Sequence, residues 1–317
     1  MYKRQYPYPL PVILGHESAG VVEAVGSDVN YVKKGDHVIT CLSAFCGHCE
    51  YCLTGQMSLC QEPELQRKGD ETPRLAQEGT PIAQFLNLSS FAEYMLVHEH
   101  AVAKIREDMP LDRAALIGCG VTTGVGAVIH TAAVEPGSTV AVIGCGGVGL
   151  SCINGAEIAG ASRIIAVDTL ASKLELARKF GATDVVNAAD NDPVEAVREL
   201  TGGGVHYAFE AIGLKVTTEQ AFKMIRAGGC ATVIGMIPVG TMVEIHGPEF
   251  LREKKLQGSN MGSNRFRVDM PRFVEFYLAG KLHLDDMISS HIKLEDVNDA
   301  FAQLETGEVA RNVIMFE

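Results

Sequence analysis

Four cysteines lie close together early in the chain and can bind one metal ion. Two, two and seven residues separate them, and they are Cys46, Cys49, Cys52 and Cys60. Four thiolates can close a tetrahedral site around Zn²⁺, and a closed site is structural. A ferredoxin iron–sulfur motif begins with the same two spacings but continues with three residues, a cysteine and a proline. Seven residues, the cysteine and Gln61 stand there instead, so the spacing predicts a structural zinc lobe over residues 41–62.

A glycine-rich turn in the middle of the chain follows an apolar, β-branched run. The stretch from Thr139 to Asp168 reads as a strand, a tight turn over residues 144–149, a helix and a second strand. A unit with this order and these glycines is the one that binds a dinucleotide. The remainder of the chain must therefore hold this unit and present whatever reacts with its ligand.

The residues of the turn have separate physical tasks. Gly144 permits the tight turn, Gly146 lets the backbone approach a pyrophosphate, and Gly149 lets the helix pack closely on the strand. The helix N-terminus also offers unpaired N–H groups to the anion. The cofactor-binding residues predicted in this turn are completed by Gly147 and Val148.

Asp168 indicates which dinucleotide to expect. It follows Gly149 by 19 residues, near the offset of about 20 residues at which a carboxylate holds a ribose 2′-hydroxyl. A carboxylate repels the 2′-phosphate of NADP, and Thr169 and Leu170 follow it rather than an arginine. The sequence therefore predicts NAD as the cofactor.

Helix and strand patterns alternate after the turn. Helices are predicted over Ala171–Phe180 and Pro193–Leu200, and strands over Asp184–Val186, His206–Glu210 and Ala231–Gly235. This alternation is typical of an α/β fold with a doubly wound parallel sheet and crossover helices.

The first part of the chain has a different pattern, of short apolar runs separated by glycine turns. These runs predict strands over Val12–Leu14, Val21–Val25, Val38–Thr40, Phe91–Val97 and Ala101–Ile105. Residues 61–84 are polar and read as a long loop. We expect a barrel-like domain here, to which the chain returns after Gly258. Helices are predicted over Met270–Leu278 and Glu295–Leu304, and a last strand over residues 309–316.

The segment around His16 resembles the signature of a known family. At the spacing of that signature stand Gly15, His16, Glu17, Gly20, Gly26 and Val29. The pattern is similar to that of the zinc-containing alcohol dehydrogenases of the medium-chain dehydrogenase/reductase superfamily. The resemblance continues through the cysteine cluster, Cys119, the glycine turn and the C-terminus. It implies a GroES-like catalytic domain over residues 1–120 and 261–317, and a Rossmann domain over residues 121–260.

The same resemblance assigns a catalytic zinc site. It implies that His16 and Cys119 are ligands of this zinc, with Glu17 beside the metal or as an alternative ligand. The family's other zinc cysteine precedes the Gly-His-Glu motif, and Met1–Leu14 contains no cysteine. We therefore expect a chain that is truncated at its N-terminus and a partial GroES-like barrel.

The resemblance also places cofactor-binding residues outside the turn. It implies that Thr123, Ile212 and Ile234 line the path of the nicotinamide and adenosine. Lys173 would bond the adenosine ribose, and Arg311 would reach the pyrophosphate.

The expected reaction is hydride transfer between a primary or secondary alcohol, or its aldehyde or ketone, and NAD. Zinc would polarise the substrate oxygen as a Lewis acid. Two alternatives remain open. One is a metal-poor enone or quinone reductase of the same superfamily, and the other is a catalytically impaired NAD-binding remnant that lacks the first zinc cysteine.

Composition limits the partners. The 317 residues carry a formal net charge of −12, which argues against nucleic acid and anionic membranes because both require basic surface. No run of about 18 apolar residues was found, so no transmembrane helix is expected. A cysteine cluster in an acidic chain without an export signal points to metal and to the cytoplasm. By resemblance, we expect a homodimer joined through the cofactor domain.

Overall fold

The computed structural model describes residues 8–61, 65, 71–307 and 309–316. Two compact units make up these residues. The central unit is Thr123–Ser263, and the flanking unit consists of the described parts of Tyr6–Thr122 and Asn264–Glu317. Residues 62–64 and 66–70 of the loop predicted over residues 61–84 lie outside the described residues.

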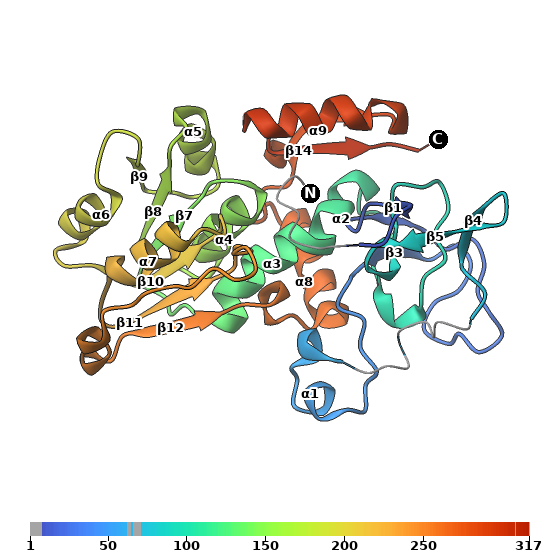
Figure 1. Cartoon of the computed structure of the whole chain (residues 1–317), viewed down its shortest axis with the longest axis horizontal. Coiled ribbons are helices and arrows are strands. Elements are labelled where there is room, and N and C mark those ends of the chain that lie inside the picture. Colours follow the sequence, from blue (N-terminus) through green and yellow to red (C-terminus); the bar gives the residue numbers. More distant parts are fainter. Residues whose placement is uncertain (1–7, 62–64, 66–70, 308, 317) are drawn as a thin grey trace. The chain divides into compact units, whose positions relative to one another are not determined.

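Apolar and β-branched runs form a six-stranded parallel sheet in the central unit (Figure 1). Its strands are β7 (Thr139–Ile143), β8 (Arg163–Asp168), β9 (Asp184–Asn187), β10 (Val205–Glu210), β11 (Ile225–Val233) and β12 (Lys255–Gly258). Their order is β12-β11-β10-β7-β8-β9. The sheet is thus wound outward in both directions from β7 and β10, and ligands of such sheets bind outside the carboxyl ends of the strands at this switch point. The predicted fold class is confirmed.

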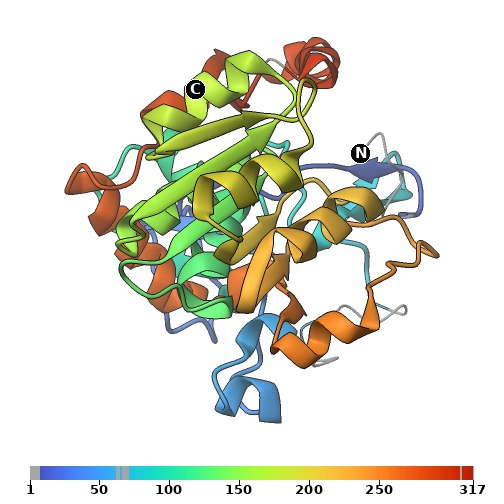
Figure 2. The same ribbon diagram turned by 90° about the vertical axis from the view of Figure 1, so that its left-hand side faces the viewer.

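Crossover helices connect these strands. They are α4 (Gly147–Ile158), α5 (Ala171–Lys179), α6 (Pro193–Thr201) and α7 (Lys215–Met224). Helix α6 begins where Asp192 Oδ1 accepts hydrogen bonds from the N–H groups of Val194 and Glu195, and it ends at Gly202, whose φ is 65°. An N-cap of this kind is worth about 1 kcal/mol. Helices α6 and α7 pack against each other (Figure 2), and both contribute apolar side chains to the core beneath the sheet.

Steric contact explains why the turn after β7 requires glycines. Gly144 has a φ of 94°, a conformation that residues with a side chain rarely adopt. A Cβ atom on Gly149 would lie 1.7 Å from the carbonyl oxygen of Gly144. Only two glycines therefore let α4 pack this closely against the end of β7.

Short strands dominate the first part of the flanking unit. One sheet has the order β1 (Val12–Ile13), β5 (Thr80–Gln84) and β4 (Leu75–Gln77). An antiparallel sheet has the order β2 (Ala19–Val21), β3 (His37–Thr40) and β6 (Val102–Lys104). The C-terminal part adds α8 (Phe266–Leu278), α9 (Val297–Thr306) and the parallel pair β13 (Ile288–Ile292) and β14 (Arg311–Ile314).

Two predictions about this unit were wrong. Residues 75–84 of the expected loop form the β4–β5 hairpin, which turns at Glu78 and Gly79, both with positive φ. The strand predicted over Phe91–Val97 does not form, and Tyr94 and Leu96 are 77% and 65% exposed. Among the described residues, no strand pairs with this segment. Elements α7, β12 and β13 were not predicted.

A long helix runs from Leu111 to Thr131. Its segments are α2 (Leu111–Leu116), the π-helical turn η5 (Ile117–Val121), α3 (Thr122–Gly126) and a second π-helical turn η6 (Ala127–Thr131). By length and composition its 21 residues could cross a membrane, which the sequence analysis overlooked. In the structure 72% of its most apolar window is buried within the protein, as in the core helix of a globular domain.

We expect Gly149→Ala to destabilise the central unit by about 3 kcal/mol, the upper end of the range for overpacking, because its Cβ atom would overlap the Gly144 carbonyl. Thermal and urea unfolding measure this loss. Gly146→Ala is the matched control in the same turn, since a Cβ atom there meets nothing within 4 Å. Equal stability of the two variants would contradict the steric account.

Candidate active site and zinc lobe

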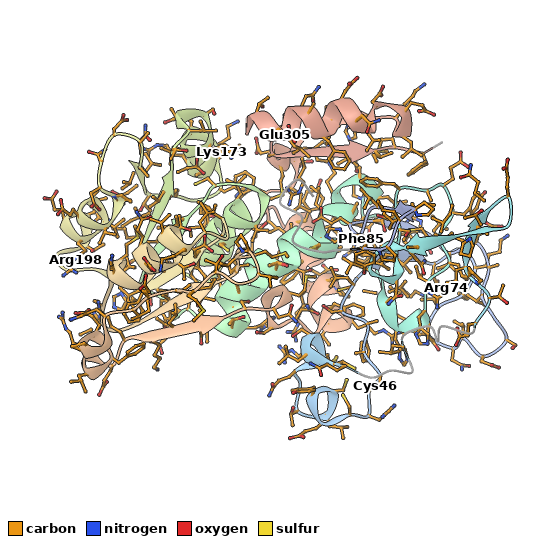
Figure 3. All side chains as sticks on the ribbon, in the orientation of Figure 1. Cys46, Arg74, Phe85, Lys173, Arg198 and Glu305 are labelled. Carbon is orange, nitrogen blue, oxygen red and sulfur yellow. The ribbon has the colours of Figure 1, made fainter. Side chains whose placement is uncertain are left out.

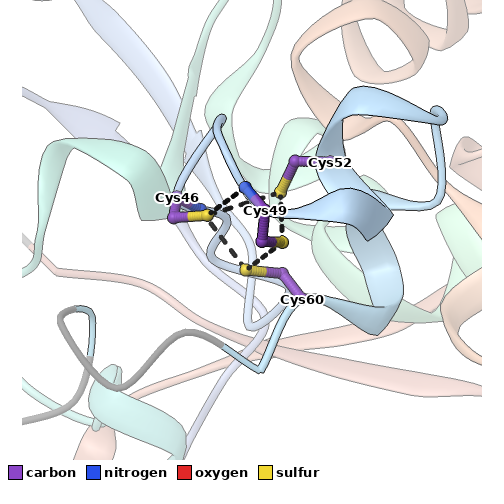
Figure 4. A group of neighbouring side chains, drawn as sticks. All are labelled: Cys46, Cys49, Cys52 and Cys60. Atoms are coloured by element: carbon purple, nitrogen blue, oxygen red, sulfur yellow. Dashed lines mark hydrogen bonds between the residues drawn. The ribbon is translucent and has the colours of Figure 1, made fainter.

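Two short elements of the flanking unit gather the four clustered cysteines. Helix α1 (Glu50–Leu53) and the 3-10 turn η1 (Met57–Leu59) contain no buried residue, so this lobe has no apolar core of its own. Its four sulfur atoms lie within 4.8 Å of one another. Sulfur–sulfur distances are 3.8 Å for Cys46–Cys52, 3.5 Å for Cys49–Cys52 and 3.9 Å for Cys49–Cys60 (Figure 4).

These distances fit one zinc ion. A tetrahedron with Zn–S bonds of about 2.3 Å has edges of about 3.8 Å. Backbone N–H groups of His48 and Cys49 donate to the Cys46 sulfur at 3.4 and 3.3 Å. Burial raises the pKa of this thiol, but these hydrogen bonds and those with the side chains of Cys49 and Cys60 outweigh it and lower the pKa of Cys46 to about 6. The chain therefore prepares a thiolate, the form that binds metal.

A close approach of two loops positions His16. The φ of Gly15 is 92°, and a Cβ atom there would lie 2.5 Å from both the Phe91 ring and the Ser90 hydroxyl. The next residue, His16, is half-buried, with its ring centroid 5.8 Å from that of Phe85. Burial lowers the pKa of His16, although Glu17 opposes this effect. The imidazole is consequently held in its neutral form, which can ligate a metal.

Glu17 joins three segments that are far apart in the sequence. Its Oε1 accepts a hydrogen bond of 2.7 Å from the Gly120 N–H, and its Oε2 lies 3.7 Å from Arg311 Nε. A Cβ atom on Gly120 would lie 2.9 Å from Arg311 Nη2 and 3.2 Å from Glu17 Oε1. The glycine is therefore required for this approach, which places Cys119, its neighbour, close to the loop of His16.

Cys119 lies in the π-helical turn η5, a feature that the sequence analysis did not predict. The wide turn is supported by a hydrogen bond of 2.6 Å from Thr122 Oγ1 to the Ile117 carbonyl. Turns of this kind often occur at functional sites. The sequence signal for this turn was the run Ile-Gly-Cys-Gly-Val, in which glycine stands on both sides of the thiol.

The described residues do not place the ligand atoms of His16, Glu17 and Cys119 as close together as those of the cysteine cluster. Among the described residues, the four clustered cysteines form the group in which at least three metal-binding side chains have ligand atoms within 4.8 Å of one another. The carboxylate of Glu17 is instead engaged by Gly120 and Arg311. Arg311, predicted to reach a pyrophosphate, thus has an acidic partner in the flanking unit.

The glycine turn and Asp168 form the predicted dinucleotide site in the central unit. Asp168 Oδ2 accepts a hydrogen bond of 2.8 Å from the Cys145 N–H, and its Oδ1 accepts from Thr169 and Leu170. These bonds fix the carboxylate at the carboxyl end of β8. The space around Gly146 is open to 4 Å, as an approaching pyrophosphate requires.

Other predicted cofactor residues lie around the same sheet. A Cβ atom on Gly144 would be 2.5 Å from the Ile212 side chain, so Ile212 covers the turn. Ile234 directly follows β11, and Lys173 lies in the first turn of α5 (Figure 3). Thr123 is buried, with its hydroxyl 3.4 Å from the Met261 sulfur.

Sequence analysis missed the role of Glu210, the last residue of β10. Its side chain is fully buried, and Oε1 accepts hydrogen bonds from Ile212 N–H at 2.9 Å, Gly213 N–H at 2.8 Å and the Thr217 hydroxyl at 2.7 Å. The carboxylate therefore fixes the loop that carries Ile212. An acidic residue that ends an apolar strand was the signal in the sequence.

Comparison with known proteins agrees with this architecture. Residues 1–107 match the family model of the alcohol dehydrogenase GroES-like domain, and residues 147–278 match that of the zinc-binding dehydrogenases. Alcohol dehydrogenase 1 of Trifolium repens is 38% identical over 315 residues, which cover 97% of this chain and 83% of that protein. Alcohol dehydrogenase class-3 of Pisum sativum is 39% identical over 312 residues, 96% of this chain and 82% of the relative.

Solved structures give the same result. Benzyl alcohol dehydrogenase from Acinetobacter calcoaceticus superposes with a TM-score of 0.92 at 34% identity, covering 99% of this chain and 86% of that one. A zinc-binding dehydrogenase from Sinorhizobium meliloti, solved with NADP bound, superposes with a TM-score of 0.78 at 29% identity over 94% of this chain and 82% of its own.

The two-way wound sheet and the GroES-like domain define a nucleotide-dependent oxidoreductase. The chain belongs to the zinc-binding alcohol dehydrogenase family of the medium-chain dehydrogenase/reductase superfamily.

We expect Cys46→Ser to remove one zinc ion per chain and to destabilise the lobe by about 4 kcal/mol, a loss typical of a removed metal site. Atomic absorption and thermal unfolding measure the two effects. Cys230→Ala is the control, because Cys230 is buried in β11 and takes no part in the cluster. If Cys46→Ser kept the zinc content and melting temperature of the wild type, the structural role of the metal would be refuted.

Proposed function

We propose that the protein is an NAD- and zinc-dependent alcohol dehydrogenase that acts on a primary or secondary alcohol or the matching carbonyl compound. The position of Asp168 carries this proposal. Its carboxylate is held at the end of β8 by three backbone N–H groups, where it meets the adenosine ribose in this fold. A 2′-hydroxyl can donate a hydrogen bond to it, whereas a 2′-phosphate would be repelled.

The residues of the chain have distinct tasks in this proposal. The open space at Gly146 and the N-terminus of α4 receive the pyrophosphate. His16 and Cys119 would hold the catalytic zinc, with the carboxylate of Glu17 beside it. When bound, zinc supplies a Lewis acid for the substrate oxygen, and the nicotinamide accepts or donates the hydride. Glu210 orients Ile212 towards the glycine turn, and Ile212 shields this region from water.

A second candidate is an NAD-binding protein without alcohol dehydrogenase activity. The observation that favours it is the spacing of His16, Glu17 and Cys119, whose ligand atoms do not gather within the described residues as those of the cysteine cluster do. Zinc stoichiometry separates the two proposals. Two zinc ions per chain with alcohol oxidation support the dehydrogenase, and one zinc with NAD binding but no turnover supports the second candidate.

We also propose a homodimer formed through the central unit. Strand β12 is the last strand of its sheet, so its outer edge lacks a partner strand in one described chain. Large apolar side chains close to it in sequence are exposed: Val239 at 95%, Met242 at 77%, Phe250 at 50% and Leu251 at 89%. An unpaired edge beside such a surface is a favourable site for association.

We further propose a cytoplasmic location, because a reducing compartment keeps the four metal-binding thiols reduced.

NAD is expected to bind at least 100-fold more tightly than NADP in isothermal titration calorimetry. Asp168→Ala should weaken NAD binding about 10- to 100-fold, because a hydrogen bond to a charged group is worth about 1.5–3 kcal/mol. Asp184→Ala, on the neighbouring strand β9, is the control and should keep wild-type affinity. Equal affinities of the wild type for NAD and NADP would overturn the NAD assignment.

Analytical ultracentrifugation tests the assembly. We expect the wild type to sediment as a dimer and Leu251→Glu with Val239→Glu to sediment as a monomer, since two charges cannot be buried without partners. Leu96→Glu is the control, because Leu96 is equally apolar and 65% exposed but lies in the flanking unit. A monomeric wild type, or a double variant that remains dimeric, would contradict the proposed interface.

A further inference from the structure

Glu210 is a buried carboxylate in which one of the two oxygen atoms lacks a partner. The residue has no exposed surface, and its Oε2 makes no hydrogen bond to any of the described residues. A Cβ atom on Gly235 would lie 2.5 Å from Oε2, so this oxygen faces the backbone of the loop after β11. A buried polar atom without a partner is unfavourable, and its presence here requires an explanation.

The charge of Glu210 is not balanced by a cation in the described part of the chain. No lysine, arginine or histidine there forms an ion pair with it. The donors to Oε1 are all neutral, namely the N–H groups of Ile212 and Gly213 and the hydroxyl of Thr217. A glutamate is ordinarily ionised at pH 7, and a proton on Oε2 would find no acceptor. The carboxylate is therefore held in place by hydrogen bonds but keeps its negative charge.

The order of the strands relates this charge to one half of the cofactor site. A doubly wound sheet of this kind has two halves, each of which binds one nucleotide of a dinucleotide. The halves here are β7-β8-β9 and β10-β11-β12. Asp168, the proposed partner of the adenosine ribose, ends β8 in the first half. The nicotinamide nucleotide therefore belongs to the second half, where Glu210 ends β10.

Glu210 also joins the two loops that follow β10 and β11. Its backbone carbonyl accepts hydrogen bonds from the N–H groups of Ile234 and Gly235 at 2.9 and 3.0 Å, and its side chain holds the loop of Ile212. Ile212 and Ile234 are both predicted to line the path of the cofactor. The buried charge is thus adjacent to two predicted cofactor contacts. A charge in a site without water acts strongly and is little screened by salt.

We propose that the charge of Glu210 shifts the relative affinity of the site towards oxidised NAD (NAD⁺) and away from NADH. This inference rests on the proposed NAD-dependent function. The nicotinamide ring carries a positive charge in NAD⁺ and none in NADH, whereas the remainder of the two molecules is the same. A buried negative charge in this half of the site therefore stabilises NAD⁺ selectively. Glu210 determines specificity for the oxidation state and takes no part in hydride transfer.

Isothermal titration of the full, zinc-saturated chain with NAD⁺, NADH and ADP-ribose tests the proposal. The variant Glu210→Gln keeps the shape of the side chain and removes its charge, so we expect NAD⁺ to bind about tenfold more weakly, the order expected for one buried unit charge. The affinities for NADH and for ADP-ribose, which lacks the nicotinamide ring, should stay close to the wild-type values. Each ligand is compared between variant and wild type, so the effects of other charges near the ring cancel.

Two further variants separate the charge of Glu210 from its structural role. Glu210→Asp keeps the charge on a shorter side chain, and Thr217→Val removes one hydrogen bond to Oε1 without changing the charge. Both should keep the wild-type ratio of NAD⁺ to NADH affinity, even where they weaken the binding of both ligands.

The proposal fails if Glu210→Gln keeps the wild-type affinity for NAD⁺, or if it weakens the binding of NAD⁺, NADH and ADP-ribose equally, since the role would then be structural. A changed ratio in Glu210→Asp or Thr217→Val overturns it as well, even if Glu210→Gln does not fold. A folded wild type that binds none of the three ligands refutes the proposed function itself, and this outcome distinguishes the two failures.

Discussion

The carboxylate of Glu17 is the interaction on which the flanking unit depends. It binds the Gly120 N–H at 2.7 Å and faces Arg311 at 3.7 Å, and so connects the loop after β1, the π-helical turn η5 and strand β14. A half-buried carboxylate with these two partners does not need a metal to balance its charge. The same contact brings His16 and Cys119 into one region. The Glu17 side chain therefore both connects segments of the flanking unit and positions the candidate zinc ligands.

The central unit depends on a different constraint, the contact between the carbonyl of Gly144 and Gly149. Because α4 packs so closely on the end of β7, its N-terminus faces the switch point between β7 and β10. Asp168 and Glu210 end β8 and β10, the parallel strands on either side of β7, and each fixes the loop that follows by accepting backbone hydrogen bonds. Carboxylates at strand ends therefore organise the carboxyl end of the sheet.

The lobe of the four clustered cysteines is stabilised in a third way, by metal ligands in place of an apolar core. Helix α1 and η1 contain no fully buried residue, so the hydrophobic effect contributes little to holding them in place. Four thiols at the spacing of a zinc tetrahedron replace the missing core. Because the ligands are close in sequence, the lobe needs little help from the remainder of the chain, and its geometry could be predicted from spacing alone.

The sequence by itself determined the features that depend on local spacing: the cysteine lobe, the glycine turn with Asp168, and the alternation that builds the parallel sheet. Only the tertiary structure decided the partners of Glu17, since 103 positions separate it from Gly120. In the tertiary structure, the strand predicted over Phe91–Val97 does not form. A strand needs a hydrogen-bonded neighbouring strand, and a local pattern of apolar residues cannot supply one. Spacing encodes how nearby residues are held, whereas contacts between distant residues follow from the packing of the whole chain.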